Sequence, residues 1–137
     1  MTGYDENSIG EILKKNRKVA VVGISDKPDR DSYRVAEYLS RKGYKIYPVN
    51  PTLKEWNGVR AYPDLKSIPR SEGIEIVDVF RKPEAVLPIA QEAVEVGAKV
   101  LWLQEGVVNK DAADLAHGKG LKVVMDRCMM KEVSRTS

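Results

Sequence analysis

Three basic side chains lie close together in the segment Val21–Leu39, which reads VVGISDKPDRDSYRVAEYL. Lys27, Arg30 and Arg34 surround the point, near Ser32, where a helix is expected to begin. Free backbone N–H groups and the helix dipole favour an anion at a helix N-terminus, so this arrangement indicates phosphate binding. Ordinary surface charge is the alternative, because aspartates in the same segment balance part of the positive charge. These aspartates are Asp26, Asp29 and Asp31.

The same segment carries only part of a dinucleotide-binding pattern. In GxGxxG one glycine makes the turn, the second lets the backbone approach a pyrophosphate, and the third allows helix packing. Here only Gly23 is present, and Ser25 stands where the second glycine would be. Small residues are favoured in any tight turn, so these two residues alone fit a plain turn as well as a ligand contact.

The end of the second expected strand, Lys45–Asn50, argues against NAD. An NAD site usually ends this strand with Asp or Glu, which accepts hydrogen bonds from the ribose hydroxyls. Here Asn50 is followed by Pro51. A neutral amide beside several cations suits a ligand that carries a phosphate on its ribose. NADP and coenzyme A both fit this description.

Alternating strands and helices are expected to position these residues. The nearly continuous apolar run Lys18–Ser25 predicts a strand that is buried on both faces. Further strands are expected at Lys45–Asn50, Val59–Tyr62, Ile74–Phe80, Lys99–Leu103 and Leu121–Met125. Helices are expected at Asp5–Lys15, at Ser32–Arg41, from Pro83 to Gly97, and from a cap at Asn109 to Ala116.

This order of elements predicts one α/β domain over residues 1–137. Strands that alternate with helices imply a parallel sheet with right-handed crossovers. We therefore expect a three-layer Rossmann-like fold with a mostly parallel sheet and the strand order 3-2-1-4-5-6. Ligands of such sheets bind beyond the carboxyl ends of the strands, where strands 1 and 4 diverge. The rim there comprises Gly23–Arg34, Asn50–Pro51, Phe80–Arg81 and Gln104–Gly106.

Several motifs in a fixed order make the sequence similar to a known family. VVGISDKPDRDSYRVAEYLSRKGYKIYPVNP is followed by VDVFRKPE, VLWLQEGVVN and VVMDRC. These motifs resemble the small stand-alone coenzyme A-binding proteins related to the nucleotide-binding domain of the succinyl-CoA synthetase alpha subunit. The resemblance covers roughly Arg17 to Cys128. One departure is Ser32, because the related synthetase subunits often carry glycine at that place.

The resemblance implies a role for each part of the rim. Asn50 and Pro51 would border the adenosine of the coenzyme, and Phe80, Arg81 and Gln104 would line the route of its pantetheine arm. The residues that would meet the phosphates and the ribose are Gly23, Ser25, Lys27, Arg30, Tyr33 and Arg34.

Cys128 follows the sixth expected strand and therefore lies on the same edge of the sheet. The sixth strand is three positions from the first, or about 14 Å at a spacing of ~4.8 Å. An extended pantetheine arm is of similar length. The coenzyme thiol is therefore expected near Cys128 when the arm crosses the fourth and fifth strands. A small buried apolar side chain is the alternative, because free cysteine is often buried.

No residue pattern indicates that the chain is catalytic by itself. The synthetase relatives pass a phosphoryl group through a histidine of a second domain, whereas His117 here is expected to be solvated or to cap a helix end. Asp78 could act as a base, but a hydrogen-bonded carboxylate in a buried strand is the more ordinary interpretation. Glu105 has no evident acid–base partner. Trp56 and Trp102 are expected to be packing residues.

The composition excludes several cellular locations and several classes of partner. The net charge of +3 and the lack of a basic block with interleaved aromatic residues argue against nucleic acid. The longest apolar runs are far shorter than the ~20 residues that span a bilayer, and no secretory signal is recognised. A cytoplasmic protein without a membrane partner is expected. A single cysteine allows neither an internal disulfide nor a structural zinc site, and no metal is expected.

We therefore expect a domain that binds coenzyme A or an acyl-CoA without independent catalysis. One alternative is an NADP-binding oxidoreductase or redox sensor that uses the same rim. Another alternative is a detached subunit of an acyl-CoA synthetase, which would act only with a partner chain. A protein partner or a homo-oligomer is compatible with each of these functions.

Overall fold

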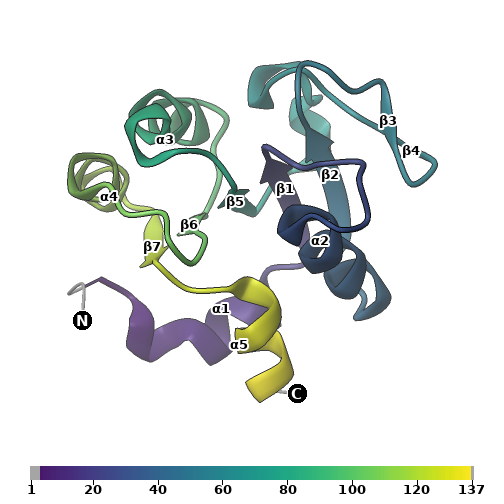
Figure 1. Ribbon diagram of the computed structural model, residues 1–137. Coiled ribbons are helices and arrows are strands. Elements are labelled where there is room, and N and C mark those ends of the chain that lie inside the picture. The colour runs from purple at the N-terminus through teal and green to yellow at the C-terminus, as the bar shows by residue number, and fades with distance from the viewer. Residues whose placement is uncertain (1–3, 137) are drawn as a thin grey trace.

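The computed structural model describes residues 4–136 and contains a parallel sheet with helices on both faces (Figure 1). The five strands lie in the order β2-β1-β5-β6-β7, and each neighbouring pair is parallel. Their bounds are β1 Lys18–Val22, β2 Lys45–Val49, β5 Ile76–Val79, β6 Val100–Leu103 and β7 Lys122–Met125. The predicted Rossmann-like α/β class is confirmed. Residues 1–3 and 137 of the expected domain lie outside the described residues.

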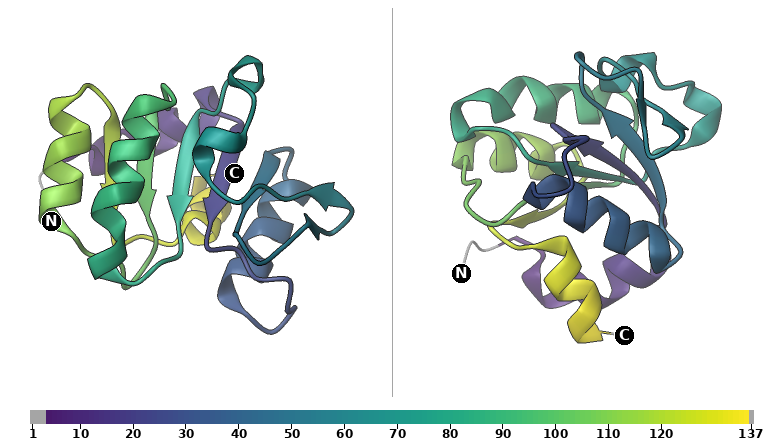
Figure 2. Two further views of the ribbon diagram at one scale, coloured as in Figure 1. Left: turned by 90° about the horizontal axis from the view of Figure 1, so that it is seen from above. Right: turned by 45° about the vertical axis from the view of Figure 1, so that its right-hand side comes forward.

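Helices form the two outer layers (Figure 2). One face of the sheet packs against α3 and α4, and the other packs against α1, α2 and α5. The bounds of the helices are α1 Ile9–Lys15, α2 Asp31–Arg41, α3 Val86–Glu95, α4 Lys110–Gly118 and α5 Met129–Thr136. Short 3-10 helices lie at Glu6–Ser8, Leu65–Ser67, Arg70–Glu72 and Pro83–Ala85. None of the helices within residues 4–136 is long and apolar enough to cross a membrane.

Apart from Asp78 in β5, the central strands are apolar on both faces, as the sequence predicts for a covered parallel sheet. Along β1, Ala20 and Val22 belong to the core under α3 and α4. Val19 and Val21 belong to the core under α1, α2 and α5. The strand therefore joins two hydrophobic cores, and its carboxyl end is held in a fixed position between them.

The helix α2 follows β1 and buries one stripe of its surface. Val35, Ala36 and Leu39 are buried at helical spacing, and the helix ends before Gly43, which has a φ of 95°. The cap predicted for α4 is also present, because the Asn109 side chain accepts a hydrogen bond from the backbone N–H of Ala112 at 2.9 Å.

The third expected strand is not part of the main sheet, so the predicted order is wrong at that position. Val59–Arg60 (β4) instead pairs antiparallel with Glu55–Trp56 (β3). The turn between them is Asn57–Gly58, and both of its residues have a positive φ, as a two-residue hairpin requires. Tyr62 still makes an isolated parallel bridge to Val49 beside β2. The other five strands have the expected order.

The helix α5 was not predicted. It is short, and its apolar anchors Met129 and Val133 are four residues apart. Glu132 is also buried, but Arg135 pairs with its carboxylate at 3.0 Å and Arg127 lies 3.7 Å from it. This helix completes the layer beneath α2 and places its N-terminus at the carboxyl edge of the sheet (Figure 1).

Candidate functional site

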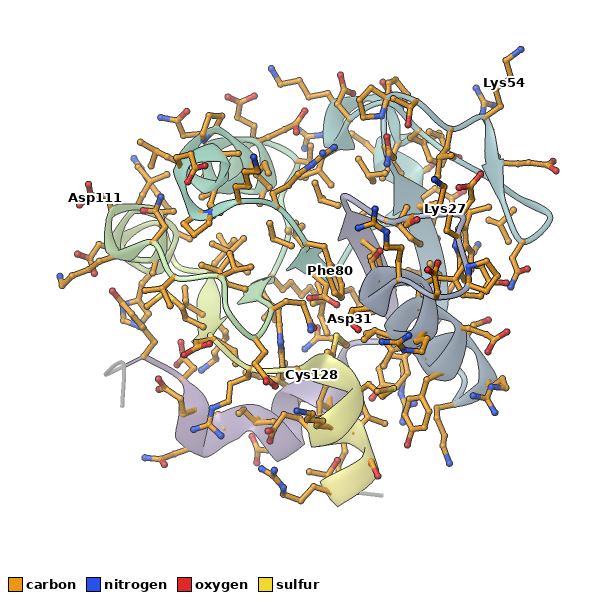
Figure 3. The ribbon with its side chains drawn as sticks, viewed as in Figure 1. Lys27, Asp31, Lys54, Phe80, Asp111 and Cys128 are labelled. Carbon is orange, nitrogen blue, oxygen red and sulfur yellow. The ribbon has the colours of Figure 1, made fainter. Side chains whose placement is uncertain are left out.

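Two adjoining pockets form a cleft at the carboxyl edge of the sheet. The larger, which we call the central pocket, has a volume of about 630 Å³ and lies between the N-termini of α2 and α5. The smaller, the loop pocket, has a volume of about 350 Å³ and lies under the β1–α2 loop. Asp31 and Phe80 line both pockets, so the cleft is continuous. Figure 3 shows these two side chains and Cys128 near the middle of the molecule.

The two pockets bring together many of the residues expected at the site, but not all. Lys27, Tyr33, Asn50 and Pro51 are not among the residues that line either pocket. The expected residues that do line a pocket are Gly23, Ser25, Arg30, Arg34, Phe80, Arg81, Gln104 and Cys128.

Gly23 is required by the meeting of two strand ends. Its φ is 88°, and a Cβ at this position would lie 2.1 Å from the carbonyl oxygen of Phe80. Any larger residue would therefore push the end of β1 away from the end of β5. The first glycine of the pattern thus allows a close contact within the protein as well as the turn.

The β1–α2 loop is held by its own hydrogen bonds. The backbone N–H of Ser25 donates to the hydroxyl of buried Ser32 at 2.9 Å, and the N–H of Lys27 donates to the hydroxyl of Ser25 at 3.1 Å. The indole of Trp56 donates to the carbonyl of Ser25 at 3.0 Å. The departure at Ser32 therefore has a structural role, because its hydroxyl satisfies a donor of the loop.

The basic residues of this loop differ in how they are used. The Arg34 guanidinium pairs with Asp31 and donates to the carbonyl of Asp29, so it holds the start of α2. The side chains of Lys27 and Arg30 are exposed and have no hydrogen bond or ion pair with any residue from 4 to 136. These two cations are available to an anion.

Asn50 joins the ends of β1 and β2. Its amide nitrogen donates to the carbonyl of Ile24 at 2.8 Å, and its oxygen accepts from the backbone N–H and the hydroxyl of Thr52. The side chain is therefore engaged on both sides. Next to it, the rings of Tyr33 and Trp56 meet with centroids 5.3 Å apart and connect α2 to the β3–β4 hairpin.

The wall of the central pocket after β5 carries two further cations. Arg81 and Lys82 line this pocket, and neither forms an ion pair within the described part of the chain. On the opposite wall, the side-chain oxygen of buried Gln104 accepts from the backbone N–H of Met129 at 3.0 Å. Gln104 thus connects the loop after β6 to the first residue of α5.

Cys128 directly precedes α5 and faces the central pocket. Its side chain is buried, with 8% of the residue exposed, and its carbonyl accepts the N–H of Glu132 at 3.1 Å. Lys131 lies on the same wall and pairs with Glu105 at 2.9 Å. Glu105 raises the pKa of Lys131, and the nearby Cys128 contributes in the same direction.

The prediction that the Asp78 carboxylate is hydrogen-bonded is wrong. Its carboxyl group is fully buried, and neither oxygen has a hydrogen-bond partner among the described residues. The residue lies inside β5 and pairs laterally with Val21 and Trp102, so apolar neighbours surround it. Burial raises the pKa of Asp78 well above its ordinary value. The carboxyl group is therefore neutral over a wider pH range than an exposed aspartate.

The remaining candidate residues lie away from the cleft or pack in the core. His117 is half-exposed, and its Nε2 lies 3.7 Å from a carboxylate oxygen of Asp5, which agrees with a solvated role. Trp102 and Trp56 are buried packing residues, as expected. Sequence reasoning missed Met130 and Lys131, because it did not predict α5. The apolar residues at helical spacing, Met129 and Val133, were the available signal.

Comparison with known proteins identifies the family of the chain. Residues 17–134 match the family described as CoA binding domain, so the chain belongs to this family. The chain is 45% identical over 129 residues to the uncharacterized protein YneT of Bacillus subtilis, and the match covers 94% of each chain. A solved structure of a hypothetical protein from Pyrococcus horikoshii is 41% identical, with a TM-score of 0.93, and the match covers 99% of this chain and 94% of that one.

The chain also matches one part of a longer protein. The alpha subunit of the ADP-forming acetate–CoA ligase II of Pyrococcus furiosus is 29% identical over 123 residues. The match covers 82% of this chain but only 27% of that subunit, so the chain spans about a quarter of the length of this relative. The predicted relation to CoA-binding domains of acyl-CoA synthetase subunits is confirmed.

Proposed function

We propose that the chain, as a single domain over residues 1–137, binds coenzyme A or an acyl-CoA along the cleft and performs no catalysis by itself. The observation that carries this proposal is the continuity of the two pockets through Asp31 and Phe80. They lie where a member of the CoA binding domain family, with this sheet, is expected to hold a nucleotide.

The nucleotide end of the coenzyme occupies the loop pocket. Arg30 lines this pocket at the N-terminus of α2, and Lys27 extends from the same loop. Both side chains are free of internal ion pairs within residues 4–136, so phosphate contacts replace water without breaking existing bonds. Charge-assisted hydrogen bonds to phosphate are the stronger kind, and the helix N-terminus adds to them.

The adenosine lies at the outer edge of the loop pocket. The resemblance implies that Asn50 and Pro51 border the adenosine, and the Asn50 amide reaches the carbonyl of Ile24, next to the pocket residue Ser25. The Asn50 side chain is engaged by Ile24 and Thr52, so its contribution is to shape the turn. The contacts with adenosine are then van der Waals contacts.

The pantetheine arm crosses the central pocket. Phe80 and Val35 supply apolar walls for its methyl-bearing part, while Arg81 and Gln104 stand on the walls at the ends of β5 and β6. Cys128 lies on the far side of this pocket, at the start of α5. The thiol of the coenzyme ends beside it, as the spacing of the strands predicts.

A role as one part of an acyl-CoA synthetase is the second candidate. It is favoured by the match to a quarter of the Pyrococcus furiosus ligase subunit. In that case the chain binds the coenzyme and a separate partner chain supplies the chemistry. Affinity purification from the native cell extract, followed by mass spectrometry, tests for such a partner. The expected cytoplasmic location stays a prediction that cell fractionation tests.

A thermal-shift titration with CoA, acetyl-CoA, NADPH and NADH tests the proposed ligand. A ligand that binds only the folded state adds about 2.7 kcal/mol of stability at one hundred times its Kd, which raises Tm by roughly 10 °C. We expect such a rise with CoA or acetyl-CoA and a much smaller one with either nicotinamide nucleotide. A rise with NADPH alone would instead support the NADP-binding alternative.

A further inference from the structure

A third hollow continues from the central pocket along the surface. It has a volume of about 430 Å³ and lies between α2 and α5, and we call it the α2–α5 groove. Met130 and Lys131 line both the central pocket and this groove. The groove therefore begins at the wall of the central pocket that also carries Cys128, two residues before Met130 on the chain.

The floor of the groove is apolar and adaptable. Tyr38 and Met130 are both partly buried, and both pack against the hydrophobic core under α1, α2 and α5. A methionine side chain adjusts its shape to irregular apolar ligands. The more exposed lining residues are Lys131, Ser134 and Arg135, which form a polar rim. A narrow apolar floor with a polar rim suits a flexible aliphatic chain.

Both cations that line the groove have acidic partners. Lys131 pairs with Glu105 at 2.9 Å, and Arg135 pairs with the buried carboxylate of Glu132 at 3.0 Å. Neither of the two cations that line the groove is without a partner, and the neighbouring Lys42 lies over the Tyr38 ring, 5.5 Å from its centroid. The lining of the groove matches a neutral chain, whose methylenes gain by leaving water.

The three hollows follow one another in the order of the parts of an acyl-CoA. The loop pocket joins the central pocket at Asp31 and Phe80, and the central pocket joins the groove at Met130 and Lys131. With the nucleotide in the first hollow and the pantetheine arm in the second, a group carried on sulfur enters the third. The groove runs from Met130 to Arg135, about 7.5 Å at 1.5 Å per residue of helix.

We propose that the α2–α5 groove binds the acyl chain of a coenzyme A thioester, and that the chain is an unbranched, uncharged one of several carbons. This inference rests on the proposed binding of coenzyme A in the cleft. It adds a preference among acyl groups, because affinity rises with each methylene that the groove removes from water.

A calorimetric series with the full chain tests this preference. The ligands are CoA, acetyl-CoA, butyryl-CoA, hexanoyl-CoA and octanoyl-CoA. From acetyl to hexanoyl we expect affinity to rise about two- to fourfold for each buried methylene, and then to level off when the groove is filled. A flat series with intact CoA binding would overturn the acyl groove and leave the coenzyme site standing. No binding of any of the five ligands would instead overturn the coenzyme site.

Two variants locate the acyl chain. Tyr38→Ala removes part of the floor, and Ser134→Trp fills the groove from its rim; neither residue lines the central pocket. Both are expected to reduce the advantage of octanoyl-CoA over acetyl-CoA to less than threefold while the affinity for CoA stays the same. Ile89→Ala, at a partly buried site in a hollow outside α3, is the matched control and keeps the full advantage.

The melting temperature of each variant shows whether it is folded. If Tyr38→Ala proves unstable, Ser134→Trp still tests the proposal, because it creates no internal cavity. An unchanged chain-length series in a folded variant of either kind would show that the acyl chain lies elsewhere.

Discussion

The rim of the cleft and the sheet interior beneath it both contain charge-bearing groups without a partner in the described chain. At the rim these are cations such as Arg30 and Arg81, which remain in contact with water. In the interior the group is the carboxyl of Asp78, which is fully buried among apolar residues. The same lack of partner therefore has opposite consequences. A solvated cation is ready for a ligand, whereas a buried acid becomes neutral and lowers stability.

The largest expected effect is the pH dependence that Asp78 gives to stability. Its pKa is raised in the folded state above the unfolded value of about 3.9, so the native state retains this proton more strongly. The resulting stabilisation is fully present below about pH 4 and is lost as pH rises toward the folded pKa. Within that window each pH unit costs about 1.4 kcal/mol of stability.

Asp78→Asn removes this titration. Urea unfolding at several pH values should show that the free energy of unfolding of the variant increases relative to that of the wild type as pH rises above about 4. Asp111→Asn, at an exposed site on α4, removes one carboxylate without burial and is the control. Parallel pH profiles of wild type and Asp78→Asn would contradict the idea that the folded protein holds Asp78 as a neutral acid.

A second effect is expected at Gly23, which lies between the rim and the sheet interior. Replacing it should lower the free energy of unfolding by about 3 kcal/mol. In Gly23→Ala the new Cβ faces the Phe80 carbonyl oxygen at 2.1 Å, and the residue must also keep a φ of 88°. Gly58→Ala is the matched control, because its φ is 80° and no atom lies within 4 Å of the new Cβ. The control should lose only about 1 kcal/mol, from backbone strain. Equal losses by urea unfolding would show that the close approach is unimportant.

Removal of one free cation at the rim should reduce ligand affinity and leave stability unchanged. Arg30→Ala is expected to weaken CoA binding about tenfold or more, since a hydrogen bond to a charged group contributes roughly 1.5–3 kcal/mol. Arg41→Ala, at the other end of α2, is the matched control and should bind normally. If calorimetry gave equal affinities for Arg30→Ala and wild type, the phosphates would have to lie elsewhere.

Arg34→Ala sharpens the same comparison. Arg34 holds Asp31 and the Asp29 carbonyl, but this contact is exposed, so Tm of the unliganded protein should change by about 1–2 °C at most. CoA affinity should fall less than in Arg30→Ala, because Arg34 is partly engaged. A large loss of Tm with unchanged CoA affinity would make Arg34 a structural residue only.

Loss of the ribose phosphate from the ligand should weaken binding about tenfold. Four cations at the rim have no ion pair within residues 4–136, and Asn50 contributes no negative charge where NAD sites carry an acid. These cations are Lys27, Arg30, Arg81 and Lys82. Dephospho-CoA should therefore bind about tenfold more weakly than CoA in a calorimetric titration. Equal affinities of CoA and dephospho-CoA would show that these cations do not contact the ribose phosphate.

The smallest expected effect is partial labelling of Cys128. Its thiolate attacks one sulfur of CoA disulfide, forms a protein–CoA disulfide and releases one CoA thiolate, so no other oxidant is needed. Burial of Cys128 makes this reaction slow. Intact mass spectrometry should show one adduct that dithiothreitol removes and that Cys128→Ser lacks. A protein that binds CoA but forms no adduct would place the end of the arm away from Cys128.

Much of the fold could be predicted because each main strand is a short apolar run between turns. Lys18–Val22 and Val100–Leu103 are buried on both faces, which only a covered sheet satisfies. The exceptions have local causes. Asn57–Gly58 favours a hairpin over a third sheet strand, and the signal for α5 is weak because only Met129 and Val133 are apolar and buried at helical spacing.

The position of the cleft was also predictable, because parallel strands place their carboxyl ends on one edge. Gly23, Phe80 and Cys128 line the cleft for this reason. The partners of individual side chains were not predictable. Arg34 binds Asp31 instead of remaining free, and the Asp78 carboxyl has no partner at all. Such choices depend on side-chain geometry that residue types and spacing do not specify.

A crystal structure of the protein with coenzyme A is the most direct test of the central claim. We expect the phosphates beside Arg30 at the start of α2, the pantetheine arm between Phe80 and Gln104, and the sulfur at the wall formed by Cys128. Coenzyme A bound outside the two pockets, or with its arm directed away from Phe80, would contradict the account.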